Sequence, residues 1–158
     1  MFKKLESKDG QAIVELAFIL PFLLIVVLGL IEFGILFYDQ AVIVAASREG
    51  ARMGITYQRD SNGDYWSLDD MQAKVEQTVD EYLQGRLITF GPIGTITTTS
   101  SRSGSIHSDG IDYYEYTPGT IGTLDVAVNY QHTYLALPKF LGWGDTINLS
   151  AETIMRLE

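Results

Sequence analysis

The chain has 158 residues, no cysteine and a formal net charge of −9, and 46% of its residues are hydrophobic. The absence of cysteine excludes a disulfide scaffold, a thiolate zinc site and a cysteine nucleophile, and the excess of acidic residues argues against nucleic acid as a partner. The hydrophobic content excludes a disordered chain, and the length fits one domain.

The N-terminal region is dominated by an apolar run. Leu16 to Ile31 contains 16 residues without a charge, and apolar flanks extend the run to a length that spans a bilayer. Glu15 and Glu32 fall at its two edges, where a carboxylate can reach water, and the outer one, Glu32, needs no special role. Basic residues precede the run and Asp39 is the first charge after it, which predicts a transmembrane helix over 11–38 with a cytoplasmic N-terminus. Residues 39–158 would then form an acidic extracytoplasmic domain.

Two alternatives explain the same run. A cleavable secretory signal would use Lys3 and Lys4 as its basic region and would release a secreted domain after Ala46. The run is longer than the apolar region of such signals, which has about 7–15 residues. A buried core helix would need more protein around it than the rest of the chain supplies. A retained membrane anchor is therefore the preferred interpretation.

Three residues inside the run affect its backbone. Pro21 removes one hydrogen-bond donor and crowds the preceding turn, which predicts a kink or a short unwound stretch. Gly29 and Gly34 are five residues apart and so do not form a GxxxG pair, but each allows a partner helix to approach closely. We expect Pro21, Gly29 and Gly34 to contribute to helix packing during assembly, together with Glu15.

The start of the run carries a recognisable processing pattern. Gly10-Gln11-Ala12-Ile13-Val14-Glu15 joins a short basic leader to the run, with a glutamate five residues past the glycine. This arrangement resembles the leader of type IV pilin-like proteins, which a prepilin peptidase cuts after the glycine. In this segment and three others the chain resembles the TadE-like family. The other three are Leu20-Pro21, Gly29-Leu30-Ile31-Glu32-Phe33-Gly34 and Ala45-Ala46-Ser47-Arg48-Glu49-Gly50-Ala51-Arg52. The resemblance is weaker over Ala151 to Arg156. Members of that family are pilin-like (pseudopilin) components of tight-adherence, or Flp-type, pilus systems.

The resemblance implies cleavage between Gly10 and Gln11, which would remove residues 1–10 as a basic leader and give Gln11 a new α-amine. In related pilins, the carboxylate that Glu15 matches is thought to pair with the α-amine of a neighbouring subunit. Such a partner offsets the cost of a carboxylate in hydrocarbon. The alternative for Glu15 is an interfacial residue without a partner. Gln11 departs from the many pilins that begin with an apolar or aromatic residue. The implied partners are the prepilin peptidase, other pilin subunits and the inner-membrane assembly platform.

Two helices are expected. The first continues out of the membrane to about Met53, with Gly54 as its stop. A polar loop over 55–66 follows it. Ser67 is a good N-cap for the second helix, which Gly85 ends. One apolar face of this helix recurs at three- and four-residue steps and should pack on a sheet: Leu68, Met71, Val75, Val79, Tyr82 and Leu83.

The remainder of the chain has a β pattern. The alternation of apolar and polar residues predicts strands over Leu124 to Gln131 and Ile147 to Leu157. Thr95 to Ser101 is rich in threonine and Asp112 to Tyr116 is aromatic, and both favour strands. The stretch from Ser100 to Gly110 is expected to form a mobile hairpin loop. A small antiparallel sheet of three or four strands follows from this pattern.

No residue set predicts catalysis or a cofactor. Asp60, Asn62 and Asp64 place oxygen donors at alternate positions, as a calcium loop does, but the glycine and glutamate that an EF-hand requires further on are missing. Ser105, His107 and Asp109 lie together in one loop, whereas a catalytic triad requires side chains held on rigid elements of the fold beside an oxyanion hole. His132, the other histidine, is expected to be packed or exposed. The aromatic residues Tyr113, Tyr114, Tyr116, Trp66 and Trp143 favour sheet packing over a binding surface.

The sequence therefore predicts an α+β protein of type IV pilin-like architecture. It would have a long N-terminal helix, half of it transmembrane, a short second helix and a small antiparallel sheet. Its expected function is that of a TadE-like minor pilin or pseudopilin. This would be a non-enzymatic structural subunit in the inner membrane, with its C-terminal domain outside and a role in surface attachment. The alternative is a permanently membrane-anchored binding module that never enters a filament.

Overall fold

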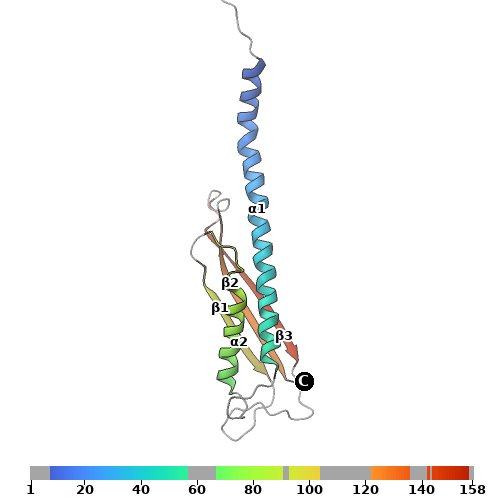
Figure 1. The fold of residues 1–158 in the computed structure, drawn as a ribbon. Helices are drawn as coiled ribbons and strands as arrows, with labels where there is room; N and C mark the ends of the chain where they lie inside the picture. The colour runs from blue at the N-terminus through green and yellow to red at the C-terminus, as the bar shows by residue number, and fades with distance from the viewer. Residues whose placement is uncertain are drawn as a thin grey trace, which may run out of the picture.

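The computed structural model describes residues 8–56, 67–90, 93–103, 122–135, 142 and 144–156. Its longest element is α1, Lys8–Gly54, an uninterrupted helix of 47 residues that projects far beyond the rest of the molecule (Figure 1). Pro21 lies inside α1 without breaking it, so of the two predicted outcomes, a kink or a short unwound stretch, the unwound stretch is absent. Proline removes a single backbone hydrogen bond, and the strongly helix-forming leucines around it keep the neighbouring turns intact.

The second helix, α2, spans Leu68–Leu83 and confirms the predicted cap and face. The Ser67 hydroxyl accepts a hydrogen bond of 3.2 Å from the backbone N–H of Asp70. Gly85 adopts a φ of 73°, a conformation that glycine tolerates and that turns the chain away from the helix. The face that α2 buries is apolar: Met71, Val75, Val79 and Leu83.

Three strands form one antiparallel sheet in the described part of the chain. They are β1 (Ile96–Ser103), β2 (Thr123–Thr133) and β3 (Thr146–Arg156), in the order β1-β2-β3. The register pairs Thr98 with Val128 and Val128 with Ala151. The strands predicted over 95–101, 124–131 and 147–157 are confirmed with small changes of boundary. The predicted hairpin loop begins too early, because β1 continues to Ser103 through its ladder with β2.

The core lies between the two helices and one face of the sheet. The C-terminal half of α1 packs against β2 and β3, and α2 lies beside it over β1 (Figure 1). Gly50 lets the helices approach, because a Cβ at this position would lie 2.6 Å from Cγ2 of Val79. The core is formed by Val42, Ile43, Ala46 and Ala51 of α1, the buried face of α2, and Leu124, Val126, Val128 and Tyr130 of β2. The α+β architecture predicted from the sequence is therefore confirmed.

Several predictions concern segments outside the described residues. These are the leader before Lys8, the polar loop over 57–66 with Asp60, Asn62 and Asp64, the loop over 104–110 with His107, the strand Asp112 to Tyr116, and Trp143.

Candidate functional site

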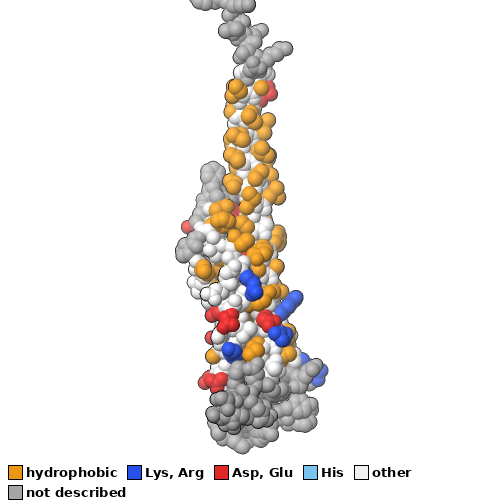
Figure 2. All heavy atoms as spheres, viewed as in Figure 1, with side chains coloured by type: hydrophobic (Ala, Val, Ile, Leu, Met, Phe, Trp, Pro, Cys, Tyr) orange, Lys and Arg blue, Asp and Glu red, His pale blue; other side chains and the backbone are white. Residues whose placement is uncertain are grey.

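The most prominent surface is the N-terminal part of α1, residues 11–31, here named the apolar rod. At 1.5 Å per residue it is about 30 Å long, which matches the hydrocarbon thickness of a bilayer. Figure 2 shows it as a column of hydrophobic side chains standing clear of the rest of the protein. Among the described residues, α1 is the one helix long and apolar enough to cross a membrane, and its most apolar window is not buried inside the structure. The large side chains exposed along the rod include Phe18, Phe22, Leu23, Leu24, Ile25 and Leu30.

The rod begins with the predicted processing residues. Gln11 and Glu15 lie one turn apart on exposed helix, and Nε2 of Gln11 donates a hydrogen bond of 3.0 Å to Oε1 of Glu15. Gly10 precedes them in the first described turns of α1. A carboxylate has acceptor sites for several hydrogen bonds, so this contact leaves room for an additional donor.

The predicted packing residues lie along the same helix. Pro21 is fully within the rod, and Gly29 is half-buried. Gly34 is exposed, and a Cβ placed on it would meet nothing within 4 Å. Gly34 therefore presents an open stretch of backbone just beyond the rod.

Glu32 differs from its expected role. Only 4% of its surface is exposed, and its Oε1 accepts a 2.6 Å hydrogen bond from the backbone N–H of Leu135. Leu135 lies two residues beyond the end of β2, and the carboxylate supplies the acceptor that this N–H needs. Glu32 is therefore a structural contact between α1 and the sheet domain, and not an unremarkable carboxylate at the outer edge of the membrane.

Asp39 and His132 form the second contact of this kind. Asp39 is fully buried and His132 is 1% exposed, and their Oδ2 and Nδ1 atoms are 2.9 Å apart. The other oxygen of Asp39 accepts a 3.0 Å hydrogen bond from the backbone N–H of Ile88. Because an ionised carboxylate only accepts hydrogen bonds, Nδ1 of His132 must carry a proton. Glu32, Asp39 and His132, named here the polar anchor, join α1 to β2 and to the segment after α2.

Two neutral contacts extend the attachment of α1 to β3. The Ser47 hydroxyl is buried and lies 2.7 Å from the Thr153 hydroxyl. Nε2 of Gln40 donates a 2.9 Å hydrogen bond to the backbone carbonyl of Ser150. With the polar anchor, these contacts fix α1 on the sheet over several turns, so the rod extends from the domain in a set direction.

Aromatic rings surround the anchor. The rings of Tyr130 and Tyr134 lie edge-on to His132, at centroid distances of 6.2 and 6.1 Å. Burial raises the pKa of the Tyr130 hydroxyl, and the nearby charge of Asp39 raises it further. This hydroxyl has no hydrogen-bond partner within the described part of the chain. Tyr130 is therefore a neutral packing residue at ordinary pH.

The polar anchor is not among the features predicted from the sequence. There, Asp39 is expected as the first charge after the membrane and His132 as a packed or exposed residue. A signal was present, because Glu32, Asp39 and Ser47 recur at steps of seven and eight residues along one face of α1. Polar residues at that spacing in an apolar helix indicate a buried polar stripe.

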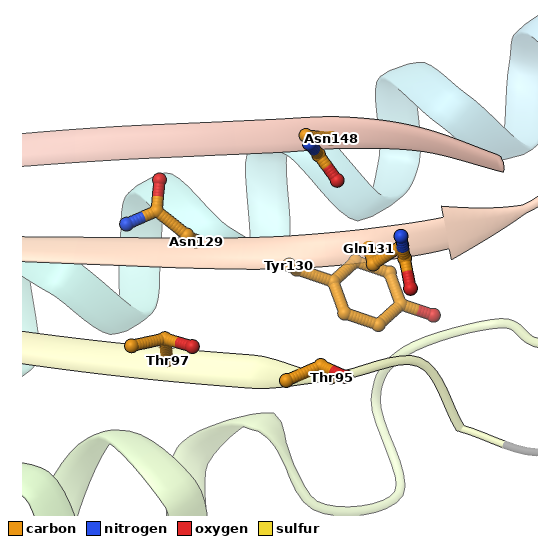
Figure 3. Close-up of a pocket in the computed structure, with 6 residues that line it drawn as sticks. All are labelled: Thr95, Thr97, Asn129, Tyr130, Gln131 and Asn148. Carbon is orange, nitrogen blue, oxygen red and sulfur yellow. The ribbon is translucent and has the colours of Figure 1, made fainter.

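The described part of the sheet carries a shallow groove of about 320 Å³. Its lining comes from all three strands and from the residue before β1: Thr95, Thr97, Asn129, Tyr130, Gln131 and Asn148 (Figure 3). The threonines offer hydroxyl groups and Asn129, Gln131 and Asn148 offer amide groups, and the lining holds no carboxylate, imidazole or amine. The groove can form hydrogen bonds with a neutral polar ligand, and its lining contains no acid–base pair. In the described ranges, no group of three or more metal-ligating side chains comes together.

Comparison with known proteins matches the N-terminal part of the chain. The family model described as TadE-like protein matches residues 10–52. The match includes the apolar rod, Glu15, and the α1 members of the polar anchor, Glu32 and Asp39. No curated protein and no solved structure matches the chain.

Proposed function

From the TadE-like character of residues 10–52, which indicates a pilin-like protein associated with a tight-adherence pilus, we propose that the chain is a minor pilin or pseudopilin of that system. It is anchored by a single span over 11–38, with its N-terminus in the cytoplasm and residues 39–158 outside the inner membrane. Its role is structural, in the assembly of a filament used for surface attachment. Its partners are the other pilin subunits, the prepilin peptidase and the assembly platform.

The observation that carries this proposal is the apolar rod held in a fixed direction by the polar anchor. The domain does not cover the rod, so its side chains are available first to lipid and then to neighbouring rods. Lipid tails are as apolar as leucine, so association between rods depends on close packing and on polar contacts. Gly34, Gly29 and Glu15 supply the small and polar positions for such contacts.

Cleavage after Gly10 would change the charge at the end of the rod. Removal of the leader would take away the basic residues before the rod and would leave one α-amine, on Gln11. Glu15 lies one turn away and already accepts a hydrogen bond from the Gln11 side chain. The α-amine of a neighbouring subunit would add the cation that a carboxylate in hydrocarbon needs, and this pairing would set the axial register between subunits.

Two measurements test the proposal. Intact mass spectrometry of the protein from cells with an active prepilin peptidase should show a chain that starts at Gln11. A chain that starts at Met1 would contradict cleavage.

Filament incorporation is tested by immunoblotting of sheared filaments. The wild-type chain should be present, and Glu15→Ala should reduce its amount at least about tenfold, because an unpaired α-amine is costly in hydrocarbon. Glu76→Ala, which removes an exposed carboxylate of α2, is the matched control and should have no effect. Membrane-bound protein that is absent from wild-type filaments would favour the permanently anchored binding module, with the sheet groove as its candidate surface.

A further inference from the structure

A second apolar surface lies on the α+β domain at the end nearest the rod. We name it the apolar collar; it consists of Ile88, Phe90, Ile93 and Ile147, all exposed, with Ile93 at 69%. Three of the four come from the segment between α2 and β1. The sequence has no charged residue between Arg86 and Arg102. Figure 2 shows hydrophobic side chains on the domain beside the base of the rod.

Hydrogen bonds fix the height of the collar along α1. The N–H of Ile88 bonds to Asp39, and Ile147 lies opposite His132, which bonds to the same carboxylate. Asp39 lies eight residues beyond the end of the rod at Ile31, a rise of about 12 Å. The polar interface of a bilayer extends about 5–8 Å beyond the hydrocarbon on each side. A modest tilt or a slightly deeper seating of α1 therefore brings the collar into that interface.

The exposed side of α1 is apolar at the same height. Phe33, Phe37 and Tyr38 are exposed there, with Phe37 at 75%. The collar and these residues together continue the apolar surface of the rod around both sides of the molecule. Two of the carboxylates at this level, Glu32 and Asp39, are turned inward and hydrogen-bonded, so they do not oppose contact with lipid. A third, Asp145, is exposed two residues before Ile147 and would face the aqueous side of the interface.

We infer that the apolar collar docks into the outer interface of the bilayer and holds the α+β domain on the membrane surface. Lipid is the occupant because the collar lies at the level of the exposed apolar residues Phe33, Phe37 and Tyr38 of α1, which lead directly into the membrane-spanning surface. Arg86 lies next to the collar segment, with its guanidinium 4.0 Å from the centre of the Tyr82 ring. An arginine at this level suits lipid phosphates while its stem covers apolar surface. The domain is otherwise acidic, so insertion of apolar side chains, and not attraction to anionic lipids, provides the contact.

This inference rests on the membrane anchoring in the proposed function and is independent of filament assembly. Because the chain has no cysteine, single cysteines can be introduced and labelled with an environment-sensitive fluorophore. The positions are Phe90→Cys and Ile93→Cys in the collar, Leu23→Cys in the rod and Ile154→Cys as the matched control. Ile154 is an exposed isoleucine seven residues along β3 from Ile147, about 23 Å farther from the membrane.

The full-length chain is reconstituted at one copy per nanodisc of phosphatidylethanolamine and phosphatidylglycerol. Iodide quenching should be at least about threefold weaker at residues 90 and 93 than at 154, because the interface excludes the aqueous quencher. Nitroxide near the start of the acyl chain should quench the labels at 90 and 93 but not at 154. Hydrogen exchange of β2 amides checks that each variant is folded.

The outcomes separate the two proposals. If the label at residue 23 is deep in lipid and those at 90 and 93 are quenched by iodide as strongly as the one at 154, the collar inference is overturned and the anchor stands. If the label at 23 is accessible to iodide, the membrane anchoring itself fails. If the collar becomes protected only in nanodiscs that hold two copies, its occupant is another subunit and the lipid inference is wrong.

Discussion

Replacing Asp39 with alanine removes the centre of the polar anchor. The carboxylate accepts hydrogen bonds from two groups that are far apart in the sequence, the backbone N–H of Ile88 and Nδ1 of His132. Both lie where water has little access, since Asp39 and His132 are almost fully buried. The substitution leaves two donors without an acceptor and a small space between α1, β2 and the segment after α2.

The expected cost follows from these two donors. Each buried donor left unpaired costs about 1–3 kcal/mol, so the two donors together cost about 2–6 kcal/mol. We therefore expect Asp39→Ala to lower the free energy of unfolding of the α+β domain by about 3–5 kcal/mol, near the middle of that range. Asp39→Asn should cost less, about 1–2 kcal/mol, because its carbonyl still accepts from Ile88 and its amide can donate to the other tautomer of His132.

Hydrogen exchange of β2 amides in detergent-solubilised full-length protein measures this effect. It reports opening of the domain even while the rod stays helical in the micelle. A loss of about 3–5 kcal/mol corresponds to exchange that is faster by a factor of about 10² to 4 × 10³. Asp80→Ala, which removes an exposed carboxylate from α2, should change stability by less than about 0.5 kcal/mol. If Asp39→Ala exchanges no faster than this control, the anchor does not hold the domain on α1 and the reasoning is refuted.

The remaining predictions concern packing and pH. Gly50→Ala should destabilise the domain by about 1–3 kcal/mol, because its Cβ would lie 2.6 Å from Val79. Gly34→Ala is the control: its Cβ would meet nothing within 4 Å, so the midpoint of thermal unfolding should stay unchanged or rise slightly. Equal effects of the two substitutions would contradict the packing of α1 on α2. Burial, reinforced by Asp39, raises the pKa of Tyr130, so the unfolded chain loses this proton first and stability should fall as the pH rises above about 10. Tyr130→Phe should reduce this loss of stability at alkaline pH. At pH 7 it should be neutral or slightly stabilising, because the hydroxyl has no partner among the described residues. If urea titrations of the variant show the same fall in unfolding free energy above about pH 10 as the wild type, Tyr130 is not the group responsible.

Features that depend on residues close together in the chain could be predicted from the sequence. The length of the apolar run, the Ser67 cap, the buried face of α2 and the alternation in β2 and β3 depend on neighbouring residues, and the structure confirms each of them. The TadE-like character of residues 10–52 was likewise visible in short motifs. Of the two outcomes predicted at Pro21, a kink or a short unwound stretch, the unwound stretch is absent, because α1 continues without interruption through this residue.

Contacts between distant segments were decided only by the tertiary structure. Glu32 and Asp39 looked like charges at a membrane edge, but the chain beyond β2 and the segment after α2 bring backbone N–H groups and His132 to them. The apolar collar likewise arises because the segment after α2 and the start of β3 are both brought to the level of Asp39 on α1. Local sequence determined which segments are apolar and helical, since those properties depend on residues a few positions apart. Which carboxylates are buried, and which apolar side chains of the domain lie beside α1 and stay exposed, depended on pairings across about a hundred residues that no local pattern encodes.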